Sequence, residues 1–311
     1  DNMDPSEVHW HKLHGLDWRN KKQYDNVQKL RQRFTDDWTV IECEDEKARD
    51  QQFAQTILAA LEHCPEHLSQ SKEKWKQAVI PEVLLHPENQ PASDEDYKKE
   101  LKKLSLKVAE ALRLDDREAI IVFEGMDAAG KAGAIKRIVK NLDPREYDIH
   151  TIAAPEKYEL RHPYLWRFWT KLQTDEDITI FDRSWYGRVL VERVEGFANE
   201  VEWQRAYEEI NRFEKDLVNS QTVVIKFWLA ISKDEQEVRF KAREETPHKR
   251  FKITADDWRN REKWDAYLDA AADMFERTST VHAPWHIIAT NDKYMARLEV
   301  LRTILKQLRA D

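Results

Sequence analysis

Residues 119–131 read AIIVFEGMDAAGK, an apolar run that passes through two glycines into a lysine. The run at 119–123 is short and lacks alternation, as in a strand covered on both faces in a parallel sheet. Apolar residues then recur at helical spacing, at Ile135, Ile138, Val139 and Leu142. A glycine turn between a strand and a helix directs backbone N–H groups and the positive helix end at one point, which predicts a phosphate-binding loop.

The turn fits the P-loop pattern G-x-x-x-x-G-K, but Ala132 stands where Ser or Thr usually offers a hydroxyl to Mg²⁺. Either the site lacks metal or another residue holds it, and Asp127 is the obvious substitute. A tight strand-to-helix turn that matches by chance is the alternative. The expected phosphate-binding residues are Gly125, Met126, Ala128, Ala129, Gly130, Lys131 and Ala132.

A second buried strand, residues 178–181, ends in Asp182. This is the form of a Walker B element, which places a carboxylate beside the metal of a P-loop; a helix-capping aspartate is the alternative. Arg183 and Arg188 follow closely, at the carboxyl end of the strand, where ligands bind in open α/β sheets. Guanidinium groups there suit phosphate oxygens.

Six cations gather in a short stretch in which only two acids oppose them: Arg239, Lys241, Arg243, Lys249, Arg250 and Lys252. The stretch reverses the sign of a chain whose net charge is −8. Residues 246–248, Thr-Pro-His, interrupt the helical pattern, which predicts an exposed lid over phosphates at about 236–258. A solvated helical face is the alternative.

The 311 residues are 41% hydrophobic, enough for a sizeable core. The negative charge disfavours nucleic acid as a partner. Cys43 and Cys64 are the only cysteines, which excludes a disulfide framework and favours a reducing compartment. No apolar run reaches the length of a membrane span, so we expect a soluble, cytoplasmic protein.

Strands alternate with helices beyond the loop, which predicts a three-layer α/β/α P-loop kinase-like sandwich with a parallel sheet. A helix is expected to begin at Ser93, with Asp96 completing its cap. The expected strands are 149–153, 178–181, 223–229 and 286–288. The expected helices are 162–172, 200–218, 234–243, 255–278 and 292–308.

The head of the chain repeats its tail: residues 17–25 match 257–265, and 38–41 match 285–288. Residues 1–62 are therefore expected to be the remnant of the end of an upstream copy. Val40 and Ile41 would form its strand. A helix would follow, with apolar side chains at helical spacing at Phe53, Ile57, Leu58 and Leu61.

The repeat aligns the histidines of residues 9–14 with residues 249–254, which argues against a metal site there. The four prolines in residues 63–92 predict a linker with at most one short helix, at about 71–79. Residues 93–311 are then expected to form one P-loop domain.

Together the three motifs resemble the family-2 polyphosphate kinases over residues 94–309. The resemblance implies that Asp127 and Asp182 organise Mg²⁺, which accounts for Ala132, although this position is often Gly in the family. Gly187 departs from the family pattern, since many members carry a larger polar residue there. The tandem arrangement is similar to the polyphosphate:AMP phosphotransferase subgroup, in which the C-terminal copy is active.

The resemblance implies transfer of the terminal phosphate of inorganic polyphosphate to AMP, giving ADP, and the reverse. Lys131, Arg183 and Arg188, with Asp127 and Asp182, would be the catalytic residues. The lid and polyphosphate residues would be Arg239, Arg243, Lys249, Arg250 and Lys252. Open alternatives are transfer to ADP, an ATP-dependent kinase, and a non-catalytic polyphosphate- or nucleotide-binding module. A homo-oligomer or pairing with an upstream domain is expected.

Overall fold

The computed structural model describes residues 39, 41, 45–62, 76–91, 93–172, 178–253 and 255–309. The chain divides into two compact units, 1–72 and 73–311. The first contains the predicted helix, α3 (Glu46–Glu62). Its apolar side chains Phe53, Ile57, Leu58 and Leu61 are exposed. The predicted strand and the histidine segment of the head lie outside the described residues, apart from Ile41, which is not in a strand.

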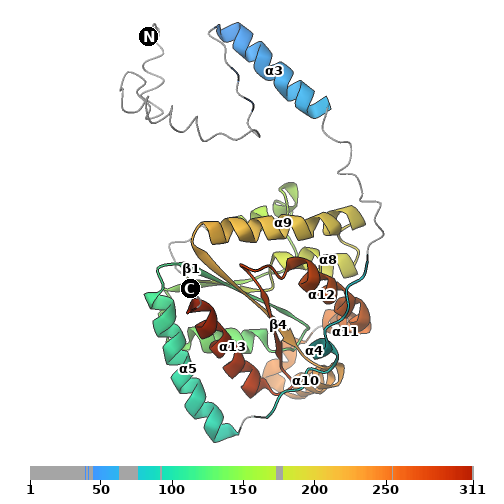
Figure 1. The fold of residues 1–311 in the computed structure, drawn as a ribbon. Coiled ribbons are helices and arrows are strands. Elements are labelled where there is room, and N and C mark those ends of the chain that lie inside the picture. Colours follow the sequence, from blue (N-terminus) through green and yellow to red (C-terminus); the bar gives the residue numbers. More distant parts are fainter. Residues whose placement is uncertain are drawn as a thin grey trace. The chain divides into compact units, whose positions relative to one another are not determined.

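A five-stranded, all-parallel sheet lies at the centre of the second unit (Figure 1). Its order is β2-β3-β1-β4-β5, so the first strand of the domain is central and the α/β prediction is confirmed. Since the strands are parallel, their carboxyl ends share one edge. The strands are β1 (Glu118–Gly125), β2 (Tyr147–Thr151), β3 (Ile178–Asp182), β4 (Thr222–Ala230) and β5 (Trp285–Ala289).

Helices flank this sheet in two groups that each pack together. One group is α5 (Asp94–Leu114), α6 (Lys131–Ile138) and α13 (Lys293–Leu308). The other is α8 (Val191–Val194), α9 (Glu200–Asn219) and α12 (Trp264–Thr278). Between them the residues of β1 are buried from Ala119 to Glu124, which explains why this strand shows no alternation of apolar and polar residues.

The helix starting at Ser93 is confirmed. Ser93 Oγ accepts a hydrogen bond from the Asp96 backbone N–H at 3.2 Å and donates to the Asp96 carboxylate at 2.7 Å. The basic stretch forms α10 (Lys233–Glu245) and the 3₁₀ helix η4 (Pro247–Lys252), which meet at the predicted interruption.

Two predicted helices are different in the structure. Residues 162–172 contain only α7 (Trp166–Trp169), preceded by a 3₁₀ turn, η2 (Glu159–Arg161). His162 is extended because the ring of the following proline disfavours helical backbone. The long helix at 255–278 divides at Lys263 into α11 (Ala255–Glu262) and α12, and both helices line the cavity described below.

The short helix predicted at 71–79 is absent from its described part, residues 76–79, and α4 (Glu82–Leu85) follows Pro81 instead. Residues 76–91 are tied to the sheet domain. The Ala78 N–H donates to buried Asp273 at 3.0 Å, and Asn89 donates to the Ala289 carbonyl at 3.0 Å. Among the described residues no helix has the length and apolarity needed to cross a membrane.

Candidate active site

The loop after β1 has the geometry of a phosphate cradle. A Cβ on Gly125 would lie 2.5 Å from the Leu229 carbonyl oxygen of neighbouring β4, so a side chain cannot fit. Ala128 and Gly130 take positive φ angles of 60° and 110°. These turns return the chain so that α6 begins at Lys131, with its first N–H groups at the carboxyl edge of the sheet.

Lys131 is buried, with 9% of its surface exposed. Its Nζ donates to the Gly125 carbonyl at 2.7 Å and lies 3.4 Å from that of Met126. Burial, and then the charge of Arg183, lower the pKa of Lys131. The ammonium group therefore lies folded back on its own loop, where an incoming phosphate oxygen would compete with the carbonyls.

Asp127 has a cation on one oxygen and an amide on the other. Arg183 donates to its Oδ1 at 2.6 Å, and Asn260 of α11 donates to its Oδ2 at 3.0 Å. Burial alone would raise the pKa of Asp127, but the charges of Lys131 and Arg183 hold it below the usual value. Asp127 is therefore a carboxylate at neutral pH.

Glu124 is a residue of the site that sequence reasoning did not assign. Its Oε1 accepts hydrogen bonds from the Ser184 backbone N–H at 2.8 Å and from the Ser184 hydroxyl at 2.9 Å. Burial raises the pKa of Glu124. The contact ties the end of β1 to the turn after β3; an acid between a buried apolar strand and the loop glycine was the available signal.

Asp182 ends β3, half-buried, and its carboxylate makes no hydrogen bond within the described part of the chain. Its charge and that of Asp127 both act on Lys131, which places the three groups near one another. No group of three or more His, Cys, Asp or Glu converges among the described residues. Two carboxylates that leave other positions to phosphate oxygens are nevertheless the donor set that Mg²⁺ takes in phosphotransferases.

A cavity of about 410 Å³ opens beside the loop. Asp127 and Arg183 line it, whereas Lys131, Asp182 and Arg188 are not part of its described wall. Arg188 instead lies with its Nε 3.1 Å from Glu192 and its guanidinium over the Tyr164 ring. The apolar part of the wall is Met126, Ile152, Ala153, Ala154, Pro155, Phe168, Leu190, Val191, Phe197, Trp228 and Trp264.

Arg239, predicted as a lid residue, braces the loop. It donates to the carbonyls of Ala128 and Ala129 at 3.0 and 3.3 Å and to those of Thr290 and Asn291 at 2.5 and 3.1 Å. Its Nε donates to Glu235 at 2.8 Å. These bonds match the five donors of a guanidinium, so in this conformation none is left for a phosphate chain.

The other predicted lid residues are less engaged with the loop. Arg250 is exposed and donates to the Glu244 carbonyl at 2.8 Å. Arg243 is half-buried. The side chains of Lys249 and Lys252 lie outside the described residues. The structure thus separates Arg239 from the exposed part of the basic stretch.

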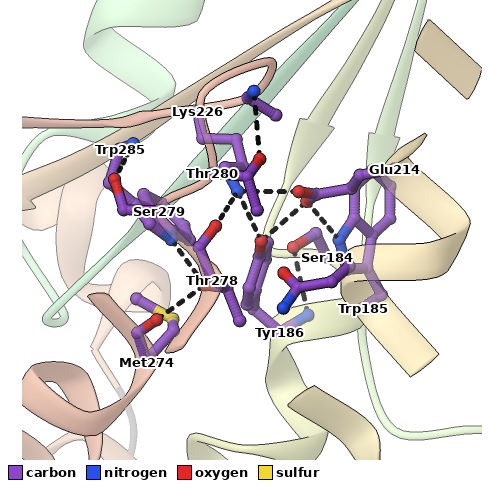
Figure 2. Close-up of polar contacts among 12 residues, drawn as sticks. Ser184, Trp185, Tyr186, Glu214, Lys226, Met274, Thr278, Ser279, Thr280 and Trp285 are labelled. Carbon is purple, nitrogen blue, oxygen red and sulfur yellow. Dashed lines mark hydrogen bonds and ion pairs between the residues drawn. The ribbon is translucent and has the colours of Figure 1, made fainter. Parts of the chain in front are cut away.

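A second charged cluster, the buried lysine network, lies behind the turn after β3 (Figure 2). Lys226 of β4 donates to Glu214 at 2.7 Å, to the Tyr186 hydroxyl at 2.8 Å and to the Thr278 carbonyl at 2.8 Å. Glu214 also accepts from Tyr186 at 2.7 Å and from the Trp185 indole at 3.1 Å. The network anchors the Trp185–Tyr186 turn that follows Arg183.

Comparison with known proteins identifies relatives. Residues 91–311 match the family model described as Polyphosphate kinase 2 (PPK2). The chain is 74% identical over 311 residues to a protein of Acinetobacter johnsonii named polyphosphate:AMP phosphotransferase, covering all of this chain and 65% of that one. A Pseudomonas aeruginosa protein of the same name is 43% identical over 322 residues, which cover 97% of this chain and 64% of that one.

Among solved structures, a putative polyphosphate kinase 2 from Pseudomonas aeruginosa PA01 matches with a TM-score of 0.76 and 41% identity. The match covers 99% of this chain and 66% of that one. The chain thus spans slightly less than two thirds of the length of these relatives.

Proposed function

We propose, since the chain belongs to the polyphosphate kinase 2 family, that it transfers the terminal phosphate of inorganic polyphosphate to AMP and forms ADP. The observation that carries this proposal is the 74% identity, over the whole chain, to a protein named for that activity. The site supports it, because a P-loop, two aspartates and an arginine converge beside a cavity of the size of a small-molecule site.

Phosphoryl transfer of this kind requires alignment and charge stabilisation more than covalent chemistry. Backbone N–H groups of residues 126–131 would cradle a phosphate. Lys131 and Arg183 would stabilise the negative charge on the transferred group, with Arg188 oriented by Glu192 nearby. Lys131 would exchange its bonds to loop carbonyls for bonds to phosphate oxygens.

A divalent cation, Mg²⁺ in this proposal, would neutralise phosphate charge when bound. Asp182 has a free carboxylate and would be its first protein ligand. Asp127 would join only after loosening its contact with Arg183 or Asn260, since both of its oxygens already accept hydrogen bonds. The residues present therefore fit a cation shared between protein and polyphosphate.

The apolar part of the cavity wall would hold the base of the nucleotide. Phe168 lines the cavity, whereas Trp166 stacks on His162 at 4.0 Å, so the aromatic segment at 158–169 serves partly as cavity wall and partly as packing. Arg243, Lys249, Arg250 and Lys252 would contact polyphosphate. Arg239 would fix the loop from behind.

The direct test is to incubate the purified chain with polyphosphate, MgCl₂ and AMP and to measure ADP by chromatography. ADP replacing AMP tests transfer to a diphosphate, and ATP replacing polyphosphate tests an ordinary nucleotide kinase. Absence of ADP from the first mixture, with Asp182→Asn as the matched negative control, would refute the proposal.

The domain assignment stays a proposal: residues 1–62 as the end of an upstream copy, 63–92 as a linker and 93–311 as the catalytic domain. A homo-oligomer or pairing with an upstream domain also remains a prediction, which light scattering of the purified protein would test.

A further inference from the structure

The wall that α11 and α12 contribute to the cavity carries two polar atoms without a hydrogen bond among the described residues. They are the side-chain oxygen Oδ1 of Asn260 and the hydroxyl Oη of Tyr267, and both are buried. Both residues line the cavity together with Asp127 and Arg183. A buried polar atom without a partner destabilises the fold, so two of them beside a reaction site require an explanation.

Both residues are held in place by their surroundings. The amide nitrogen of Asn260 donates to Asp127 at 3.0 Å, and its amide oxygen has no hydrogen-bond partner among the described residues. Tyr267 is 9% exposed and lies in α12 between Trp264 and Leu268, which are part of the core. Both residues therefore have fixed positions in the wall, with the two polar atoms covered in this conformation.

The chemistry of the two atoms restricts the ligand. Asn260 Oδ1 can only accept a hydrogen bond. A fully ionised phosphate offers no donor, so phosphate cannot satisfy it. Burial, and then the charges of Glu195 and Asp127, raise the pKa of Tyr267, so its hydroxyl stays protonated and able to donate. A neutral hydroxyl satisfies both atoms, since it donates to one and accepts from the other.

We propose that Asn260 Oδ1 and Tyr267 Oη together bind a ribose hydroxyl of the acceptor nucleotide. This wall then recognises the sugar, while the loop after β1 recognises phosphate. The inference rests on the proposed function, in which a ribonucleotide occupies the cavity, and it adds a contact that the P-loop motifs do not contain.

The test compares AMP, 2′-deoxy-AMP and 3′-deoxy-AMP in the wild type and in Tyr267→Phe. The wild type should prefer AMP over one of the deoxy analogues about 3- to 10-fold in kcat/KM, the range of a neutral hydrogen bond. Tyr267→Phe should lose that factor with AMP and lose nothing with that analogue. Tyr207→Phe is the matched control, because Tyr207 accepts from Arg193 on α8 and does not line the cavity.

Several results would overturn the inference. Equal losses of kcat/KM with all three nucleotides in Tyr267→Phe would show a structural role for Tyr267. No loss of kcat/KM with any of them would show that the Tyr267 hydroxyl does not bind the nucleotide. A change confined to the preference for AMP over GMP would assign the pair to the base. Calorimetric binding of AMP and the weaker analogue reads the same ratio without turnover. The inference can therefore be judged even if the wild type forms no ADP.

Discussion

The molecule contains two clusters of positive and negative side chains, one fully buried and one partly exposed, that differ in how completely their groups are paired. In the buried lysine network, Lys226 uses its three donors on three protein oxygens, and Glu214 accepts on both carboxylate oxygens. The loop cluster consists of Asp127, Lys131, Asp182 and Arg183. Here the Asp182 carboxylate accepts no hydrogen bond among the described residues, and Lys131 donates only to backbone carbonyls.

The difference separates a structural cluster from a reactive one. The buried lysine network has no unpaired donor on Lys226 for a ligand to accept from. Its role is to fix the positions of Trp185 and Tyr186. A cluster with free acceptors and displaceable bonds is prepared to exchange partners when phosphate and a cation arrive. Both places hold a buried lysine among carboxylates, so the pairing of individual atoms is the informative property.

The largest expected effect is on the loop cluster. Asp182→Asn keeps the shape of the side chain but removes the charge available to a cation, and Lys131→Ala removes a charge from the transferred phosphate. Each should lower the rate of ADP formation roughly 10³- to 10⁴-fold, about 4–5.5 kcal/mol. The thermal midpoint of Asp182→Asn should stay near that of the wild type. Near-normal rates would assign the reaction elsewhere.

The buried lysine network should respond in the opposite way. Lys226→Met leaves the Glu214 carboxylate buried without its cation, so urea titration should show a loss of about 3–5 kcal/mol in the free energy of unfolding. ADP formation per folded molecule should change little. The double variant Lys226→Met, Glu214→Leu should recover most of the stability. A rate loss as large as that of Asp182→Asn would abolish the distinction between the clusters.

Arg239 tests the border between bracing and substrate binding. Arg239→Lys keeps the charge but cannot make the four bonds to carbonyls, so kcat should fall about tenfold through a displaced loop. The KM for polyphosphate should stay the same, measured by varying chain concentration at saturating AMP. If Arg239 instead binds polyphosphate, the change should appear in KM and in its dependence on salt.

The smallest expected effect concerns Glu124, whose pKa is raised in the folded state by burial. Its contribution to stability is fully present below the usual glutamate pKa of about 4.3 and is lost as pH rises through the raised folded value. Wild type should therefore lose stability relative to Glu124→Gln as the pH rises from 4 to 7. Urea titrations at several pH values measure this difference, and a constant difference would contradict it.

Local sequence was sufficient for much of the fold. A few adjacent residues were enough to predict the apolar run of β1, the glycine loop and Asp182 at the end of β3. The α5 cap and the break at Thr246–His248 were likewise readable from neighbours. The helix expected at 162–172 was wrong, since only Trp166–Trp169 is α-helical. Pro163 holds His162 in extended backbone, a local signal against a start at 162 that apolar spacing outweighed.

The rest depended on contacts between distant segments. Asn260 reaches Asp127 across 133 positions, and Arg239 reaches Ala128 across 111. No spacing rule indicates that Arg239, within a basic stretch, will donate its guanidinium hydrogen bonds to backbone carbonyls. Lys226 and Glu214 read as ordinary charges within a strand and a helix until packing buries them together.

Because all strands of the sheet are parallel, unit 73–311 has a carboxyl edge and an amino edge that carry different groups. The phosphate loop and its partners lie at the carboxyl edge, whereas the turns before β4 and β5 lie at the other edge. Val281, fully exposed in the second of these turns, is therefore suited to covalent attachment. After Cys43 and Cys64 are replaced, a thiol in the variant Val281→Cys would couple the enzyme to a bead or an electrode with its reactive edge turned toward the solution.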